Sequence, residues 1–160
     1  MQQLNVFEWL GNTALAISIR DSPWLFPIIE TAHIIGFIVL VGSAFLFDLR
    51  LLGVAKKISV KDVADYVLPW SRWSLLVVAP TGFLLFMSEA EALSHNWVFG
   101  LKLVLILTAL INAGLFHQFT FRSADRWSHS QTPMAARAAA LISITLWLSV
   151  ISCGRFIAYL

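Results

Sequence analysis

Charged residues are scarce in this sequence, and the chain contains a single cysteine. Only 12% of its 160 residues are Asp, Glu, Lys or Arg, against about 25% in a typical soluble domain. A soluble domain of this size cannot hide 59% hydrophobic residues, because much of a small domain remains at its surface. The lone Cys153 excludes an internal disulfide and a secreted cysteine framework. The scarcity of charge excludes an ordinary soluble enzyme and favours an integral membrane protein.

Several functional signatures are also missing. The 8 glycines and 5 prolines are too few for a disordered polymer. A formal net charge of +2 excludes a strongly basic nucleic-acid binder, so no nucleic-acid partner is expected. The sequence contains no CxxC, CxxCH, HExxH, GxGxxG or P-loop motif, which argues against covalently attached c-type haem and against phosphate-loop chemistry.

Four apolar stretches are long enough to cross a bilayer, which takes about 20 apolar residues per helix. Short linkers between them predict antiparallel neighbours. The predicted fold is therefore all-α: an integral membrane four-helix bundle, surrounded by the lipid bilayer and forming a single membrane domain over residues 1–160. The expected spans are about 24–47, 67–88, 98–121 and 135–158.

The segment before the first span predicts an N-terminal amphipathic helix over residues 4–19. Its apolar residues gather near one helical face, as in helices that lie in the membrane interface. Further along, Ser59 followed by Asp62 predicts a short capped surface helix in the link between the first two spans.

The distribution of Lys and Arg predicts the orientation, because basic links stay in the cytoplasm. The link between the second and third spans contains Glu89, Glu91 and His95 but neither Lys nor Arg. Both termini are therefore expected in the periplasm of a bacterial inner membrane. The basic residues on the expected inner side are Arg50, Lys56, Lys57, Lys61, Arg72, Arg122, Arg126 and Arg137.

An outer polar cluster is the first candidate site. Glu30 and His33 fall in the outer half of the first span, Lys102 begins the third, and Arg155 lies near the end of the fourth. Ionisable residues inside a span are costly and usually face a partner or a cavity. We expect His33 to face the bundle interior within reach of Lys102. Glu30, one turn from His33, is the expected hydrogen-bond acceptor that orients the ring.

Residue type alone leaves the role of His33 open between a haem or metal ligand, a proton relay and a hydrogen-bonded packing residue. Gly36, one turn further on, suits either a flat macrocycle or close helix packing. Lys102 suits either the site or a side chain that snorkels to the headgroups. A second, inner cluster contains Asp48, Arg50, His117, Arg122 and Asp125. There an Asp48–Arg122 pair that anchors two helices is the leading interpretation, with His117 as an interfacial residue or a second ligand.

Several short segments carry a resemblance to known membrane proteins. They are His-Ile-Ile-Gly at 33–36, Asp-Leu-Arg-Leu-Leu-Gly at 48–53, and Trp-Val-Phe-Gly-Leu-Lys-Leu at 97–103 followed by Asn112 and His117. Together they resemble a broad group of small four-helix bacterial membrane proteins. That group includes the HemJ-type protoporphyrinogen oxidases and the CopD-type copper-resistance membrane proteins.

The HemJ-type proteins bind haem b through an essential histidine on their first helix and carry a lysine at the start of their third. His33 and Lys102 match those positions, and Pro80 and Gly82 resemble the proline and glycine of their second helix. The resemblance therefore implies haem b with His33 as an axial ligand of iron. Lys102 would serve as a second ligand, a propionate partner or a proton donor.

Three functions remain in competition at this point. The first is a membrane haem b protein, an oxidoreductase in one form, that exchanges electrons with quinone or a periplasmic redox partner. The second is a copper or other metal-ion transporter in which Glu30, His33 and His95 present the ion and His117 lies on the exit side. The third is a scaffold subunit of a membrane complex. A homo-oligomer is compatible with each of them.

Overall fold

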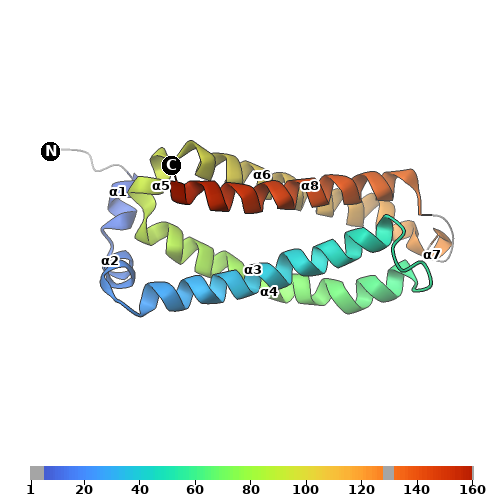
Figure 1. Ribbon diagram of the computed structural model, residues 1–160, viewed down its shortest axis with the longest axis horizontal. Helices are drawn as coiled ribbons and strands as arrows, with labels where there is room; N and C mark the ends of the chain where they lie inside the picture. Colours follow the sequence, from blue (N-terminus) through green and yellow to red (C-terminus); the bar gives the residue numbers. More distant parts are fainter. Residues whose placement is uncertain (1–5, 128–131, 160) are drawn as a thin grey trace.

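The computed structural model describes residues 6–127 and 132–159, apart from the side chains of residues 125 and 126. These described residues form helices and no strands. Four helical segments are long and apolar enough to cross a membrane: Leu25–Leu51, Val60–Ser88, Trp97–Ser123 and Met134–Tyr159. They form an elongated antiparallel bundle (Figure 1), which confirms the predicted all-α membrane fold.

The bundle consists of two helix pairs. Helix α3 (Leu25–Leu51) packs along α4 (Val60–Ser88), and α6 (Trp97–Leu115) packs along α8 (Met134–Phe156). The pairs meet mainly through α3 and α8. Figure 1 shows α1, α2, α5 and the end of α8 at one end of the bundle, and the α3–α4 loop with α7 (Ala124–Trp127) at the other. We call these the α5 end and the α7 end.

The prediction of one continuous amphipathic helix over residues 4–19 is wrong. Residues 4 and 5 lie outside the described residues, and the rest forms two short helices, α1 (Val6–Gly11) and α2 (Ala14–Asp21). Thr13 separates them, because its hydroxyl donates to the Leu10 carbonyl at 2.8 Å and accepts from the Ala16 amide at 3.3 Å. Such local bonds compete with a continuous helix. Both helices pack against the bundle, and Ala16 is completely buried.

The second span starts earlier than predicted. Ser59 does cap a helix, since its hydroxyl accepts from the amides of Lys61 and Asp62 at 3.1 and 3.3 Å. That helix is not a separate surface helix, because it runs on as α4 through Pro69 and Pro80 to Ser88. The short α5 (Ala90–His95) follows, and the Asn96 side chain then caps α6 by accepting from Val98 and Phe99.

The third span ends irregularly. After α6 the chain forms a π-helical turn, η1 (Phe116–Thr120), then a 3-10 turn, η2 (Phe121–Ser123). Turns of π-helix are rare overall, and those that occur are often found at functional sites. His117 lies inside this turn. A last 3-10 turn, η3 (Ile157–Tyr159), extends α8.

Buried apolar side chains form two clusters. One joins Phe47, Leu51 and Phe116 with residues of α4, α7 and α8 at the α7 end. The other lies near mid-bundle around Leu40, Ala109 and Trp147. Neither cluster includes a residue of α3 before Phe37, and the buried residues nearer the α5 end include Met87, Val98 and Cys153.

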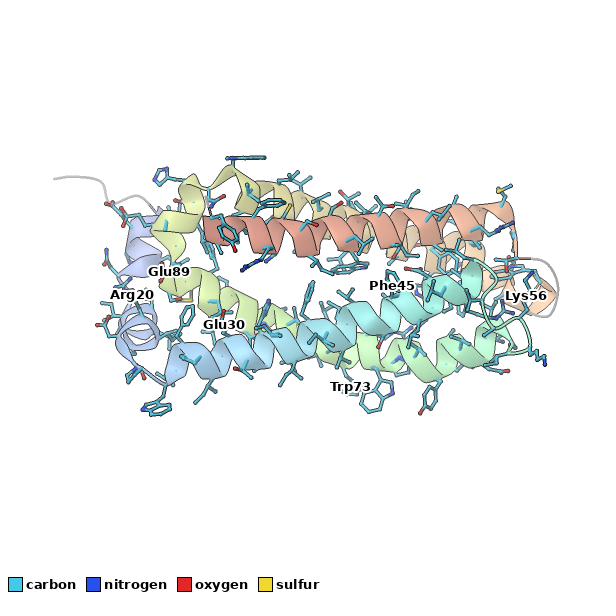
Figure 2. The ribbon with its side chains drawn as sticks, viewed as in Figure 1. Arg20, Glu30, Phe45, Lys56, Trp73 and Glu89 are labelled. Carbon is cyan, nitrogen blue, oxygen red and sulfur yellow. The ribbon has the colours of Figure 1, made fainter. Side chains whose placement is uncertain are left out.

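The outer surface of the spans is apolar, as expected for a lipid-facing protein. Trp73 is 69% exposed, and Figure 2 shows it pointing away from the bundle. Charged residues instead mark the ends. Figure 2 shows Arg20 and Glu89 at the α5 end and Lys56 at the α7 end.

Candidate functional site

His33 lies between α3 and α4 and is half-buried. Its Nδ1 atom is 3.0 Å from the Thr81 hydroxyl oxygen on α4. The ring stacks on Phe37, one turn further along α3, with 6.5 Å between ring centroids and 19° between planes. His33 is therefore held by contacts from two helices.

The hydrogen bonds of Thr81 determine which ring nitrogen of His33 carries the proton. A hydroxyl has one hydrogen to donate, and the Thr81 hydroxyl donates to the Val77 carbonyl at 2.6 Å. With its hydrogen on the Val77 carbonyl, its oxygen accepts from the Nδ1–H of His33, and this arrangement favours the Nδ1-protonated tautomer. The ring also hydrogen-bonds the backbone of Val78, whose carbonyl lies 3.3 Å from the same hydroxyl. With the proton on Nδ1, the neutral ring presents an unprotonated Nε2, the form that binds a metal.

Two glycines bring the helices close together around this histidine. A Cβ atom on Gly82 of α4 would lie 2.9 Å from Cε1 of His33, so only glycine leaves space for the ring there. Gly36 is buried, and a Cβ on it would lie 2.9 Å from a Val78 methyl group. Of the two roles weighed for Gly36, the structure shows close helix packing.

Lys102 approaches the same region from the other helix pair. Its side chain is half-buried, and its ammonium nitrogen lies 3.8 Å from the Cβ position of Gly154 on α8. The Lys102 charge is close enough to act on both His33 and Cys153. Lys102 therefore lies on the opposite helix pair from His33, and its charge acts on the ring from there.

Glu30 and Arg155 do not join His33 in a hydrogen-bonded cluster. Glu30 is exposed on the α5-end half of α3, and Thr81 supplies the ring contact that was expected from Glu30. Arg155 is exposed and engages its own helix end, donating to the Tyr159 hydroxyl with its guanidinium 4.8 Å from the Tyr159 ring centroid. The expected orienting role of Glu30 is wrong, because the side-chain hydrogen bond of the His33 ring goes to Thr81.

His95 lies apart from His33, exposed on α5 beside a surface hollow that Arg20, Glu89 and Glu91 also line. Over residues 6–127 and 132–159, no group of three or more His, Cys, Asp or Glu side chains is placed to hold a metal ion. Glu30, His33 and His95 therefore do not form the ion site considered for a transporter.

A cavity of about 230 Å³ lies between the four long helices, between the bundle middle and the α7 end. We call it the Asp48 cavity. Its wall is mainly apolar and includes the aromatic side chains of Phe47, Phe116 and Trp147. Its polar lining residues are Asp48, Ser71, Arg72, Asn112, His117 and Ser143.

Asp48 is the most enclosed polar group of this cavity, with 6% of its surface exposed. Ser143 donates a side-chain hydrogen bond to its carboxylate. Its Oδ2 atom is buried without a hydrogen-bond partner among the described residues. The expected Asp48–Arg122 pair is wrong: Arg122 is exposed, and the ion pair found in the described part of the chain is Arg20–Asp21 at 3.9 Å.

The other members of the expected inner cluster separate. Arg50 is buried and donates to the Ile58 carbonyl at 2.6 Å, which closes the α3–α4 loop. The Asp125 side chain lies outside the described residues. His117 does line the Asp48 cavity, where its ring stacks on Phe47 with 6.5 Å between centroids, and the charge of Arg72 acts on it.

Sequence reasoning missed Thr81, Arg72 and Ser143 as site residues. Thr81 and Arg72 lie on α4 and Ser143 on α8, so their proximity to the two candidate sites depends on how the helices pack. A signal was available for Arg72, since an ionisable residue inside a predicted span is a candidate by default. Thr and Ser carry no such signal, because they hydrogen-bond their own helix in most spans.

Comparison with known proteins places the chain in one family. A model of a family of unknown function, DUF6644, matches residues 7–160. The chain belongs to this family. Neither the curated proteins nor the solved structures gave a match.

Proposed function

We propose that the protein is a membrane haem b protein of electron transfer or quinone-linked redox chemistry, with His33 as an axial ligand of the iron. One observation carries the proposal: His33 Nδ1 lies 3.0 Å from the Thr81 hydroxyl, whose hydrogen bond to the Val77 carbonyl favours the tautomer with the proton on Nδ1. Ligating histidines in proteins almost always donate their second N–H in this way, which fixes the tautomer and the ring orientation.

The surroundings of His33 also suit a haem b group. Gly82 places no side chain against the ring. Lys102 brings a positive charge from the opposite helix pair, which matches the carboxylates that a haem b carries. Bound haem supplies one-electron chemistry, and the surrounding helices set its potential through ligation and burial. A quinone or a periplasmic redox partner would exchange electrons with it.

Copper transport has no comparable support. A copper site draws on several converging imidazole, thiolate or thioether ligands. His33 is accompanied by a hydroxyl and a lysine instead, and the described residues contain no group of three metal-binding side chains.

Thr81→Val is expected to weaken haem binding by about 10–100-fold, because removing the partner of a ligating histidine typically has that effect. The measurement is haem affinity by titration of apoprotein in detergent. Thr108→Val is the matched control, since the Thr108 hydroxyl on α6 makes the same bond to its own helix, to Val104 at 2.8 Å, and no bond to a histidine. Equal affinity in the two variants would contradict the proposed role of Thr81.

We further propose that the α5 end faces the periplasm of a bacterial inner membrane. The Lys56–Lys57 loop lies at the α7 end, as the positive-inside rule requires for a cytoplasmic face. In a Cys153→Ala background, a cysteine at exposed Asn12 is expected to react with a membrane-impermeant thiol reagent in intact cells. A cysteine at exposed Lys57 should react only after the membrane is opened, and the reverse pattern would overturn the orientation.

A further inference from the structure

We propose that the Asp48 cavity binds the ring of a membrane quinol, with a ring hydroxyl donating a hydrogen bond to Oδ2 of Asp48. This inference deepens the proposed function and rests on it for the choice of a quinol. The cavity is a separate place from the His33 region, because neither His33 nor Lys102 is among its lining residues.

The size of the cavity selects a single ring. Its volume is about 230 Å³. An apolar cavity of about 150 Å³ takes benzene, and pockets for drug-sized ligands start at about 300 Å³. One substituted ring therefore fits. Phe47, Phe116 and Trp147 offer aromatic faces or edges against which such a ring packs.

The chemistry of Asp48 selects a hydrogen-bond donor. An unprotonated carboxyl oxygen accepts hydrogen bonds. Ser143 donates one, and the buried Oδ2 has none in the described part of the chain. Leaving a buried acceptor unsatisfied costs the desolvation penalty of that group, which exceeds the net value of an ordinary hydrogen bond. A ligand that brings an O–H group into the cavity removes this cost.

The remaining polar groups select a neutral ligand with a second oxygen. Arg72 and His117 line the same cavity and offer N–H donors. A free cation is disfavoured by the charge of Arg72. A quinol is neutral and has one hydroxyl at each end of its ring, so it can donate to Asp48 and accept from Arg72 or His117. The cavity lies within the membrane-spanning segments, where a lipid-soluble ligand is available.

The test is an anaerobic titration of the detergent-purified protein with a decyl-substituted benzoquinol, followed by tryptophan fluorescence. Trp147 lines the cavity and serves as the reporter. Saturable quenching is expected, and most of it should disappear in Trp147→Phe. The corresponding benzoquinone, which has no O–H group, is expected to bind at least about tenfold more weakly, because it leaves the buried Oδ2 unsatisfied.

Asp48→Leu is expected to weaken quinol binding at least about tenfold while leaving quinone binding nearly unchanged. Replacing a buried, poorly satisfied charge by an apolar residue is often neutral or stabilising, so the variant should fold. Asp48→Ala, which also removes the acceptor oxygen, decides the matter if the leucine variant does not fold. Asp65→Leu, at an exposed carboxylate on α4 outside the cavity lining, is the control and should bind like wild type.

Three results would overturn the inference: no saturable quenching, quenching that persists in Trp147→Phe, or equal binding of quinol by wild type and the Asp48 variants. The same titration of His33→Ala protein separates this inference from the proposed function. Quinol binding in that variant should equal wild type whether or not the wild-type protein binds haem.

Discussion

His33→Ala is expected to abolish haem binding while the bundle stays folded. The imidazole is the proposed bond to iron, and no second histidine lies in the described contacts of Thr81, Gly82 or Lys102. The variant removes a ring that contacts Phe37 and α4 but leaves both buried apolar clusters intact. Haem content after purification from haem-replete cells, together with helicity by circular dichroism, measures the two parts of the expectation.

His95→Ala is the matched control for that experiment. His95 is exposed on α5 and contributes no contact to His33, so its loss should leave haem content at the wild-type level. Wild-type haem content in His33→Ala would show that another residue ligates the iron. An unfolded His33→Ala protein would show that the histidine is a packing residue, which is the structural alternative for this position.

Gly36→Leu is expected to have the largest effect on stability. The first added carbon alone would lie 2.9 Å from a Val78 methyl and 3.4 Å from a Val77 methyl. Both valines are β-branched and have little rotamer freedom in a helix. Relief of the clash therefore requires α3 and α4 to separate along the most extensive helix contact of the bundle. Overpacking of this kind typically costs about 1–3 kcal/mol for added methylenes, and the longer leucine side chain should reach at least the upper end.

Gly42→Leu on the same helix provides the control. A Cβ atom on Gly42 meets no heavy atom within 4 Å, and the residue is exposed. Thermal unfolding in detergent should show a strongly lowered midpoint for Gly36→Leu and a nearly unchanged midpoint for Gly42→Leu. Similar midpoints for the two variants would mean that the α3–α4 contact is not as close as the Gly36 geometry indicates.

The four spans could be predicted from the sequence because length and hydropathy alone define them. Helix ends were less predictable. The predicted helix over 4–19 breaks at Thr13, because the Thr13 hydroxyl bonds both the Leu10 carbonyl and the Ala16 amide. The spacing of apolar residues does not reveal that a side chain competes with the helix for these backbone groups. The start of α4 was missed for a related reason: the cap at Ser59 was found, but the helix it begins continues through two prolines into the span.

The candidate site was partly predictable. Ionisable residues in an apolar span stand out in the sequence. This signal was enough to single out His33, Lys102, Asp48 and His117. Their partners were not, because the Thr81 hydroxyl and the Ser143 hydroxyl reach them only through the relative rotation of separate helices. For the same reason the sequence paired Asp48 with Arg122 by charge, whereas packing encloses Asp48 with Ser143.

The most direct measurement of the central claim is an oxidised-minus-reduced absorption spectrum of the wild-type protein, purified in detergent from haem-replete cells. A haem b protein with histidine ligation gives a Soret band that shifts on reduction, and the band should disappear in His33→Ala and persist in His95→Ala. A wild-type protein that is folded but shows no haem absorbance would contradict the proposed function.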